Sequence, residues 1–158
     1  MKIGVLSDTH LTQVHQSLGE SLNRHFGDVD LVLHAGDVVE PAVLDFFCGR
    51  DLVLVAGNMD SPAIRKTAPL KRVIPLGHFT VGLIHGWGSP VGIEERIIEE
   101  FDSIDVLVYG HTHRASSHLK NGVLFFNPGS PTDKRFTSVN TIGILEIGEQ
   151  ITSSIIPL

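Results

Sequence analysis

The chain has 158 residues and a mass of 17.2 kDa, the size of one ordinary domain, so we expect residues 1–158 to form a single domain. Its formal charge of -6 argues against long-range attraction to nucleic acid or to anionic membranes. The single cysteine, Cys48, excludes an internal disulfide and a cysteine-rich zinc site, so any bound metal needs His, Asp, Asn or Glu ligands.

The beginning of the chain carries only a short apolar run before Asp8, and no stretch reaches the length of a membrane span. We therefore expect a cytoplasmic protein without a membrane partner and without stable binding of nucleic acid. Exposed edge strands in a sheet-rich fold would permit a homo-oligomer.

The first half of the chain alternates between strand-like and helix-like segments. Short apolar runs typical of buried strands occupy Lys2–Ser7, Asp30–Ala35 and Leu52–Ala56. Apolar residues recur every four positions from Leu11 to Phe26, which predicts an amphipathic helix with Thr12 as its N-cap. Pro41 opens a second, short helix that continues to Phe47.

The second half is richer in strands. A hairpin is predicted around Gly77-His78 and another around Asn121-Gly122, and one helix is predicted between them, from Gly92 to Phe101. Alternating isoleucines from Ile142 to Ile155 predict antiparallel strands at the end of the chain. Two mixed sheets packed face to face, with helices on their outer faces, accommodate this order, so the expected fold class is α/β.

Side chains that can bind a metal follow five of the predicted strands. They are Asp8 and His10, Asp37, Asn58, His85, and His111 with His113. A single polar residue at a strand end is usually a turn former or a helix cap, but turn chemistry alone does not explain five such strand ends. Loops at the carboxyl ends of strands in an α/β sheet face one crevice, so we expect these side chains to converge there.

The residue types indicate which ions would bind. Carboxylate and amide oxygens mixed with imidazoles suit Mn²⁺, Ni²⁺, Fe²⁺, Zn²⁺ or Co²⁺. Seven ligands are more than one tetrahedral ion uses, and with one bridging carboxylate they fit two ions about 3.5–4 Å apart. We therefore expect two divalent metal ions, with Mn²⁺ as the first candidate.

The segment Tyr109-Gly110-His111-Thr112-His113 places two imidazoles two residues apart after an apolar run. If the chain stays extended beyond Gly110, the two-residue period of a strand points His111 and His113 in the same direction.

The order of these motifs resembles the calcineurin-like metallophosphoesterases. That family has Asp-x-His, Gly-Asp, Gly-Asn-x-Asp, His-Gly and Gly-His-x-His in this order, and here the motifs are Asp8-Thr9-His10, Gly36-Asp37, Gly57-Asn58-Met59-Asp60, His85-Gly86 and Gly110-His111-Thr112-His113. The short chain and Asn127-Pro128-Gly129-Ser130 are similar to the compact branch of YfcE-like phosphodiesterases and the Vps29 retromer subunit. The resemblance implies a four-layer α-β-β-α sandwich.

The resemblance also implies roles for the site residues. One metal would be held by Asp8, His10 and His113, and the other by Asn58, His85 and His111, with Asp37 as the bridge. The reaction implied is hydrolysis of a small phosphodiester by a metal-bridging hydroxide, and the candidate catalytic residues are Asp37, Asn58, His111 and Asp60.

One position departs from the pattern of the larger phosphatases, which carry a proton-donating histidine directly after the Asn. This chain has Met59 there, so the general acid is not identified. Asp60 either supplies a proton or only orients its neighbours.

Two alternatives remain open from the sequence. The first is a non-catalytic scaffold like Vps29, which uses the fold to dock other proteins. The second is a DNA exonuclease of the same superfamily, but the chain lacks the extra length, the basic surface and the histidine after Asn58 that such an enzyme would have.

Overall fold

The computed structural model describes all residues from 1 to 158 and contains two five-stranded mixed sheets. The first sheet has the order β10-β9-β1-β2-β3 and is made of β1 (Lys2–Leu6), β2 (Leu31–His34), β3 (Leu52–Leu54), β9 (Thr141–Ile147) and β10 (Ile151–Pro157). The second has the order β4-β5-β6-β8-β7 and is made of β4 (Lys71–Leu76), β5 (Phe79–Ile84), β6 (Val106–Val108), β7 (Ser116–Lys120) and β8 (Val123–Asn127). The expected α/β class with two mixed sheets is confirmed.

Both sheets mix parallel and antiparallel pairs. In the first sheet β1, β2 and β3 run parallel, β9 pairs antiparallel with β1, and β10 pairs antiparallel with β9 at the edge. In the second sheet β5, β6 and β8 run parallel, and β4 and β7 pair with them as antiparallel hairpin partners. The parallel strands of a sheet all end at one edge, so their following loops are gathered there.

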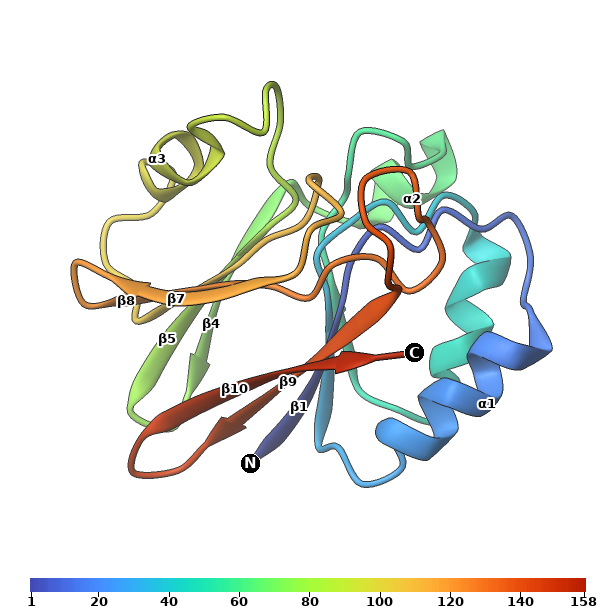
Figure 1. Ribbon diagram of the computed structural model, residues 1–158, viewed down its shortest axis with the longest axis horizontal. Coiled ribbons are helices and arrows are strands. Elements are labelled where there is room, and N and C mark those ends of the chain that lie inside the picture. The colour runs from blue at the N-terminus through green and yellow to red at the C-terminus, as the bar shows by residue number, and fades with distance from the viewer.

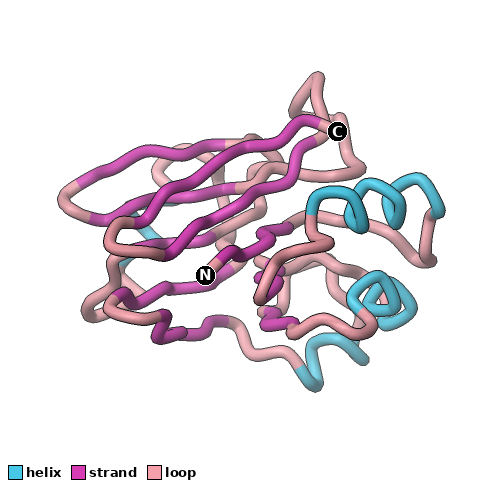
Figure 2. The backbone as a smooth tube through the Cα atoms, turned by 90° about the horizontal axis from the view of Figure 1, so that it is seen from below, coloured by secondary structure: helices cyan, strands magenta, loops and turns pink.

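Helices cover the outer faces of the sheets. The first sheet is flanked by α1 (Gln16–His25), the 3-10 helix η1 (Pro41–Phe47) and α2 (Pro62–Thr67), whereas α3 (Ile93–Ile98) lies beside the second sheet. Figure 1 shows α1 and α2 on one side of the strands and α3 on the opposite side. In Figure 2 most of the helical turns (cyan) gather on one side of the strands (magenta).

Three apolar cores separate these layers. The central core joins the facing sides of the two sheets, with Val5 and Leu33 from one and Val108 and Phe126 from the other. A second core packs the first sheet against α1, η1 and α2, and a third packs the second sheet against α3. Three cores between four layers give the α-β-β-α arrangement.

The first helix begins later than the sequence pattern predicts. It starts at Gln16 rather than at Leu11, His15 occupies the N-cap position without a side-chain cap, and the predicted cap Thr12 lies outside the helix. Leu11 instead forms a parallel bridge with Val39, which holds this segment beside the loop after β2. The helical periodicity therefore extends into residues that tertiary pairing keeps out of the helix.

Other local features are closer to expectation. The predicted Asn121-Gly122 turn joins β7 to β8, and both residues have the positive φ of a type I′ hairpin, 52° and 82°. The short helix α2, which the sequence reading did not include, begins with a proline after Ser61. None of the helices combines the length and the apolar character that crossing a membrane requires.

Candidate metal centre

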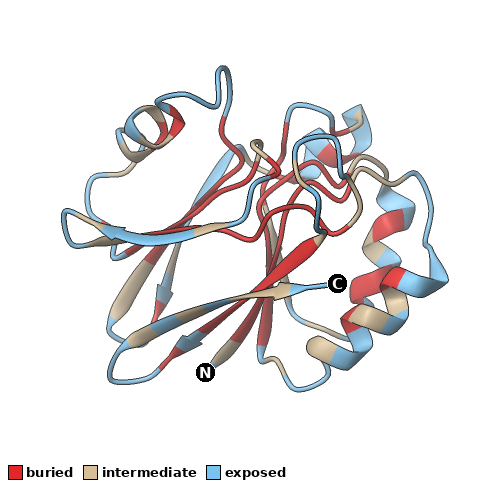
Figure 3. Cartoon of the chain, in the orientation of Figure 1, coloured by how far each residue is buried: buried red, intermediate tan, exposed pale blue.

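The loops that follow β1, β2, β3, β5 and β6 meet at one place and bring the predicted ligands together. Two groups have ligand atoms within 4.8 Å of one another, Asp8 with His10 and His113, and Asp8 with Asp37 and His85. Asn58 and His111 lie beside the second group, with Asn58 Oδ1 3.1 Å from His85 Nε2 and 3.0 Å from His111 Nδ1. Figure 3 shows that these central loops are largely buried (red), although they carry polar side chains.

Asp8 has one carboxylate oxygen bound by the protein and one without a hydrogen-bond donor. The Ser7 hydroxyl and the His111 backbone N–H donate to Oδ2 at 2.7 and 3.0 Å. Oδ1 is buried without a hydrogen-bond partner, and it lies 3.3 Å from His113 Nε2 and 3.7 Å from His10 Nε2. A buried carboxylate oxygen that faces two imidazoles is suited to a cation between them.

Asp37 has the same division between its two oxygens. The Met59 backbone N–H donates to Oδ1 at 2.7 Å, while Oδ2 lies 3.5 Å from His10 Nε2 and 3.3 Å from His85 Nε2. This oxygen therefore stands between a histidine of the first group and a histidine of the second. That is the position a bridging carboxylate needs.

The hydrogen bonds of His85 and His111 determine which ring nitrogen is free. His85 Nδ1 lies 2.8 Å from the Ala35 carbonyl and His111 Nε2 lies 2.8 Å from the Gly88 carbonyl, so each of these nitrogens must donate a proton. In the neutral rings the other nitrogen carries a lone pair, and in both rings it faces Asn58 Oδ1. His85 Nε2, His111 Nδ1 and Asn58 Oδ1 thus face one another, each with a lone pair and none with a proton. This arrangement suits a metal ion between them.

The backbone at the site is bent by left-handed residues. Asp8, His10, Asp37, His111 and His113 have positive φ values between 46° and 69°, a conformation that is uncommon outside glycine. Such residues gather where the surrounding structure holds a functional geometry. Five of the seven predicted ligands are among them.

These bends correct one expectation. The chain does not stay extended beyond Gly110, since His111 and His113 both have positive φ. The two imidazole rings therefore do not face the same predicted ligand. His113 Nε2 faces Asp8, whereas His111 Nδ1 faces Asn58. Gly110 itself allows the close approach, because a Cβ there would lie 1.7 Å from the Ser7 hydroxyl oxygen.

Asp60 ties the ligand loops together. Its buried carboxylate accepts backbone N–H groups from Asp37 at 3.1 Å, Val39 at 2.6 Å and Gly57 at 2.7 Å. These three hydrogen bonds occupy both carboxylate oxygens with backbone donors of the ligand loops. The geometry supports the orienting role that the sequence left open for Asp60, and it places the loops after β2 and β3 in a fixed register.

The electrostatics favour positive charge at the centre. Burial raises the pKa of Asp8, but the His10 and His113 imidazoles beside its carboxylate and the nearby His85 outweigh burial and hold the pKa well below its usual range. Burial likewise opposes ionisation of Asp37, yet His85 lowers its pKa, and burial of His85 is outweighed by Asp37 and Asp8, which raise the pKa of that imidazole. Two ionised carboxylates thus attract a cation, and the residues present fit two divalent metal ions.

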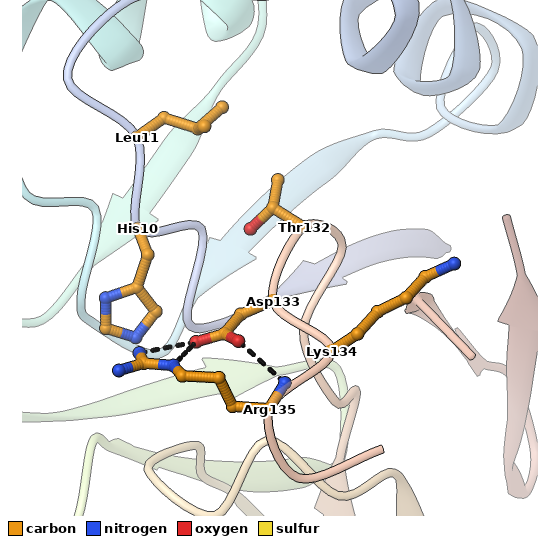
Figure 4. Close-up of a pocket in the computed structure, with 6 residues that line it drawn as sticks. All are labelled: His10, Leu11, Thr132, Asp133, Lys134 and Arg135. Carbon is orange, nitrogen blue, oxygen red and sulfur yellow. Dashed lines mark hydrogen bonds and ion pairs between the residues drawn. The ribbon is translucent and has the colours of Figure 1, made fainter. Parts of the chain in front are cut away.

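Asp133 belongs to this centre but carries no signal in the sequence motifs. Its Oδ2 lies 3.2 Å from His113 Nδ1, the ring nitrogen opposite the one that faces Asp8. Figure 4 shows Asp133 beside His10 and paired with Arg135, whose Nε donates to it at 2.7 Å. This contact is the approach of a charged oxygen and not a formed hydrogen bond, and a carboxylate at this place orients the ring of a metal-binding histidine.

We expect Asp133→Ala to weaken metal binding about 10- to 100-fold at the position held by Asp8, His10 and His113, because His113 loses the group that orients it. Titration of the metal-free protein with Mn²⁺ by calorimetry checks this. Asp102→Ala, at an exposed loop carboxylate, is the matched control and should titrate as the natural chain does. Equal affinity in both variants would contradict the role of Asp133.

His34 lies next to the ligand loops without being a ligand. The Gly36 backbone N–H donates to its Nδ1 at 3.2 Å, so Nε2 carries the proton and donates to the Thr9 hydroxyl at 2.7 Å. The side chain is fully buried, and this burial lowers its pKa to about 4. His34 is therefore a neutral, hydrogen-bonded histidine of the interior, as its place in an apolar strand indicates.

A neutral buried histidine makes folding depend on pH. As the pH falls below 6.5, the unfolded chain binds a proton at His34 while the folded chain binds it only near pH 4, so stability is lost across this window. At about 1.36 kcal/mol per pKa unit, the stability advantage of the natural chain over His34→Gln should shrink by roughly 3 kcal/mol between these limits. Urea unfolding of both chains at the same metal loading measures this difference in unfolding free energy. A difference that stays constant between pH 6.5 and pH 4 would contradict the prediction.

Two side chains at the end of β8 and just after it donate hydrogen bonds to the backbone of the ligand loops. Asn127 Nδ2 donates to the Gly110 carbonyl at 3.0 Å, the Ser130 hydroxyl donates to the Asp8 carbonyl at 2.7 Å, and both side chains are buried. These two residues shape the ligand loops, which is the role their motif indicates.

Comparison with known proteins gives a consistent picture. A family model described as the calcineurin-like phosphoesterase superfamily domain matches residues 1–150. A probable metallophosphoesterase of Methanothermobacter thermautotrophicus is 36% identical over 159 residues, which covers 99% of this chain and 92% of that protein.

Solved structures share the arrangement of strands. An archaeal protein described as a novel phosphodiesterase superposes with a TM-score of 0.79 at 28% identity, and the match covers 100% of both chains. Vps29 of Entamoeba histolytica in complex with Zn²⁺ superposes with a TM-score of 0.73 at 24% identity over 99% of both chains. At that identity the second likeness concerns the fold alone.

Proposed function

Because the chain belongs to the calcineurin-like phosphoesterase superfamily, we propose that it is a dinuclear metal-dependent phosphodiesterase that hydrolyses small phosphodiesters. The observation that carries this proposal is the complete set of seven donors around two adjacent positions. In particular, the buried Asp8 Oδ1 has no hydrogen-bond donor, and Asn58 Oδ1 faces two imidazole nitrogens.

The donors divide between the two positions. Asp8, His10 and His113 would hold one ion, Asn58, His85 and His111 would hold the other, and Asp37 would contact both. Mn²⁺ is our first candidate, and Ni²⁺, Fe²⁺, Zn²⁺ and Co²⁺ suit the same mixed set of oxygen and imidazole ligands. Two such metal ions would supply a nucleophilic hydroxide and would hold the non-bridging oxygens of the phosphate.

The chain's own residues arrange the reaction. Asp60 holds the backbone of Asp37, the Ser7 hydroxyl holds the carboxylate of Asp8, and the Gly88 carbonyl fixes the ring of His111. Met59, 57% exposed beside Asn58, has a thioether and cannot donate a proton to a leaving group. We therefore expect esters with a stabilised leaving oxygen to be preferred, and the proton to come from water or from the substrate itself.

The direct test uses two substrates with the same leaving group. Protein loaded with Mn²⁺ or Ni²⁺ is assayed on bis(p-nitrophenyl) phosphate and on p-nitrophenyl phosphate, with chelator-treated protein as the control. We expect metal-dependent turnover with a higher kcat/KM for the diester. No turnover of either ester above the control would refute the enzyme, and preference for the monoester would refute the phosphodiesterase.

Met59→His should restore a proton donor beside the centre. We expect it to raise kcat for an alkyl phosphate ester, whose leaving group is poor, by about 10²-fold, and to change the nitrophenyl ester much less, since nitrophenolate leaves unprotonated. Met59→Gln, which adds polarity without a titrating group, is the matched control. Equal changes in kcat for Met59→His and Met59→Gln would show that the change does not come from a proton donor at position 59.

A scaffold role without catalysis is the competing hypothesis. The complete donor set favours the enzyme, because a docking surface does not require buried carboxylates aimed at imidazoles. Recovery of a stoichiometric protein partner by chain that is metal-poor and inactive would favour the scaffold instead.

A further inference from the structure

A cleft of about 580 Å³ lies over the metal centre, and its rim differs from its floor in character. The floor is made of predicted ligands, namely His10, Asp37, Asn58, His111 and His113. The rim carries the apolar side chains Met59, Val91 and Phe136 and the cationic side chains Arg114 and Arg135. Met59 is the variable position of the motif Gly57-Asn58-Met59-Asp60, and the other rim residues lie outside the motifs that contain the predicted ligands.

The three apolar rim side chains are unusually open to solvent. Met59 is 57% exposed, Val91 84% and Phe136 56%, and they come from three separate loops, after β3, after β5 and before β9. Single exposed apolar residues are common on protein surfaces and need no explanation. Their convergence in one cleft above a polar floor indicates a surface that a ligand covers.

The ring of Phe136 is held next to a predicted ligand. It packs edge-to-face on His113 with ring centroids 5.3 Å apart and an interplanar angle of 88°, and the Arg135 guanidinium lies 5.9 Å from its centroid. With these contacts formed, the residue is still 56% exposed, and it lines the cleft. A planar aromatic group of a ligand could stack on this exposed surface while its phosphate lies over the metals.

The rim cations are notable in a chain of net charge -6. Arg135 is paired with Asp133, whereas the guanidinium of Arg114 forms no ion pair. An unpaired arginine at the mouth of the cleft attracts anions and can hold a phosphate oxygen. The cleft thus offers Arg114 to an anionic group of a ligand and the exposed side of Phe136 to an aromatic group.

We propose that the substrate is a phosphodiester in which the ester group that is not released is aromatic and lies against Phe136, Val91 and Met59. Arg114 contacts the phosphate of that same molecule. This inference rests on the proposed function, because the scissile phosphate must lie over the metal centre. It names the substrate class that the cleft selects, a diester whose retained group is an aryl ring rather than a short alkyl chain.

Two substrates with one leaving group isolate this recognition. p-Nitrophenyl phenyl phosphate and p-nitrophenyl methyl phosphate both release nitrophenolate, so the ratio of their kcat/KM values reports on the retained group. We expect the Mn²⁺-loaded enzyme to prefer the phenyl ester about tenfold, the upper range for one aromatic contact. Phe136→Ala should lower this ratio to about twofold, and Phe136→Tyr should restore it.

Leu119→Ala is the matched control, since Leu119 is 72% exposed on β7 and does not line the cleft. The control should keep the natural ratio. Binding of phenylphosphonate against methylphosphonate, measured by calorimetry on the Mn²⁺-loaded chains, gives a second readout that needs no turnover.

The outcomes separate the two proposals. Equal kcat/KM for both esters, or a natural ratio that survives Phe136→Ala, would overturn the aromatic subsite while leaving the phosphodiesterase intact. If neither ester is hydrolysed, the proposed function is refuted. The aromatic subsite is then supported if the natural chain binds phenylphosphonate more tightly than Phe136→Ala does, and it is refuted if the two chains bind it equally.

Discussion

Asp37→Asn should lower kcat/KM for bis(p-nitrophenyl) phosphate by about a thousandfold or more, the largest loss that we expect from one isosteric substitution. Asp37 Oδ2 stands between His10 and His85, so in the proposed centre it would be shared by both metal positions. An amide has no negative charge to hold two cations close together. The side chain keeps its shape, and its Oδ1 can still accept the Met59 backbone N–H.

The measurement compares steady-state hydrolysis by the Mn²⁺-loaded natural chain and by the variant, with metal content determined for both. Asp102→Asn makes the same chemical change at an exposed carboxylate and should retain full activity. Circular dichroism checks that both variants are folded. A folded Asp37→Asn chain with activity within tenfold of the natural one would rule out Asp37 as the bridge.

His111→Ala and His113→Ala should each remove a different metal ion. His113 Nε2 lies 3.3 Å from Asp8 Oδ1 in the first group, and His111 Nδ1 lies 3.0 Å from Asn58 Oδ1 in the second. Each variant therefore loses a ligand from one position and keeps the other set complete. We expect two ions per natural chain and one in either variant, together with loss of hydrolysis.

Elemental analysis after equilibrium dialysis against Mn²⁺ measures this stoichiometry. His78→Ala, at the exposed tip of the β4–β5 hairpin, is the control and should bind two ions. Retention of two ions by either His111→Ala or His113→Ala would show that the two histidines do not divide between the metals as proposed.

Much of the centre could be predicted because its residues are tied to strand ends. A parallel strand needs a loop at its carboxyl end, and short apolar runs identify these strands in the sequence. The polar residues that follow such runs, from Asp8 to His113, are brought together by the topology of the two sheets. Periodicity and spacing were therefore sufficient to find them.

Contacts made across long separations in sequence could not be predicted in this way. Asp133 lies twenty residues after His113, in a loop without periodicity, and only the folded chain places it behind the ring. The same applies to the Gly88 carbonyl, which fixes the free nitrogen of His111. The start of α1 was missed because Leu11 pairs with Val39, and local pattern gives no sign of that bridge.

The bend after Gly110 shows how tertiary packing overrides a local rule. A two-residue period would place His111 and His113 on one side, but both residues adopt positive φ values, 69° and 58°. The His111 backbone N–H then reaches Asp8 Oδ2 at 3.0 Å. The backbone of one ligand thus orients another, while its own ring faces Asn58.

Anomalous diffraction from Mn²⁺-loaded crystals would show directly whether one chain holds two metal ions that share Asp37. We predict two anomalous peaks about 3.5–4 Å apart. One should contact Asp8, His10 and His113, the other Asn58, His85 and His111, with Asp37 Oδ2 between them. A single peak at full Mn²⁺ loading, or two peaks without Asp37 between them, would contradict the dinuclear centre.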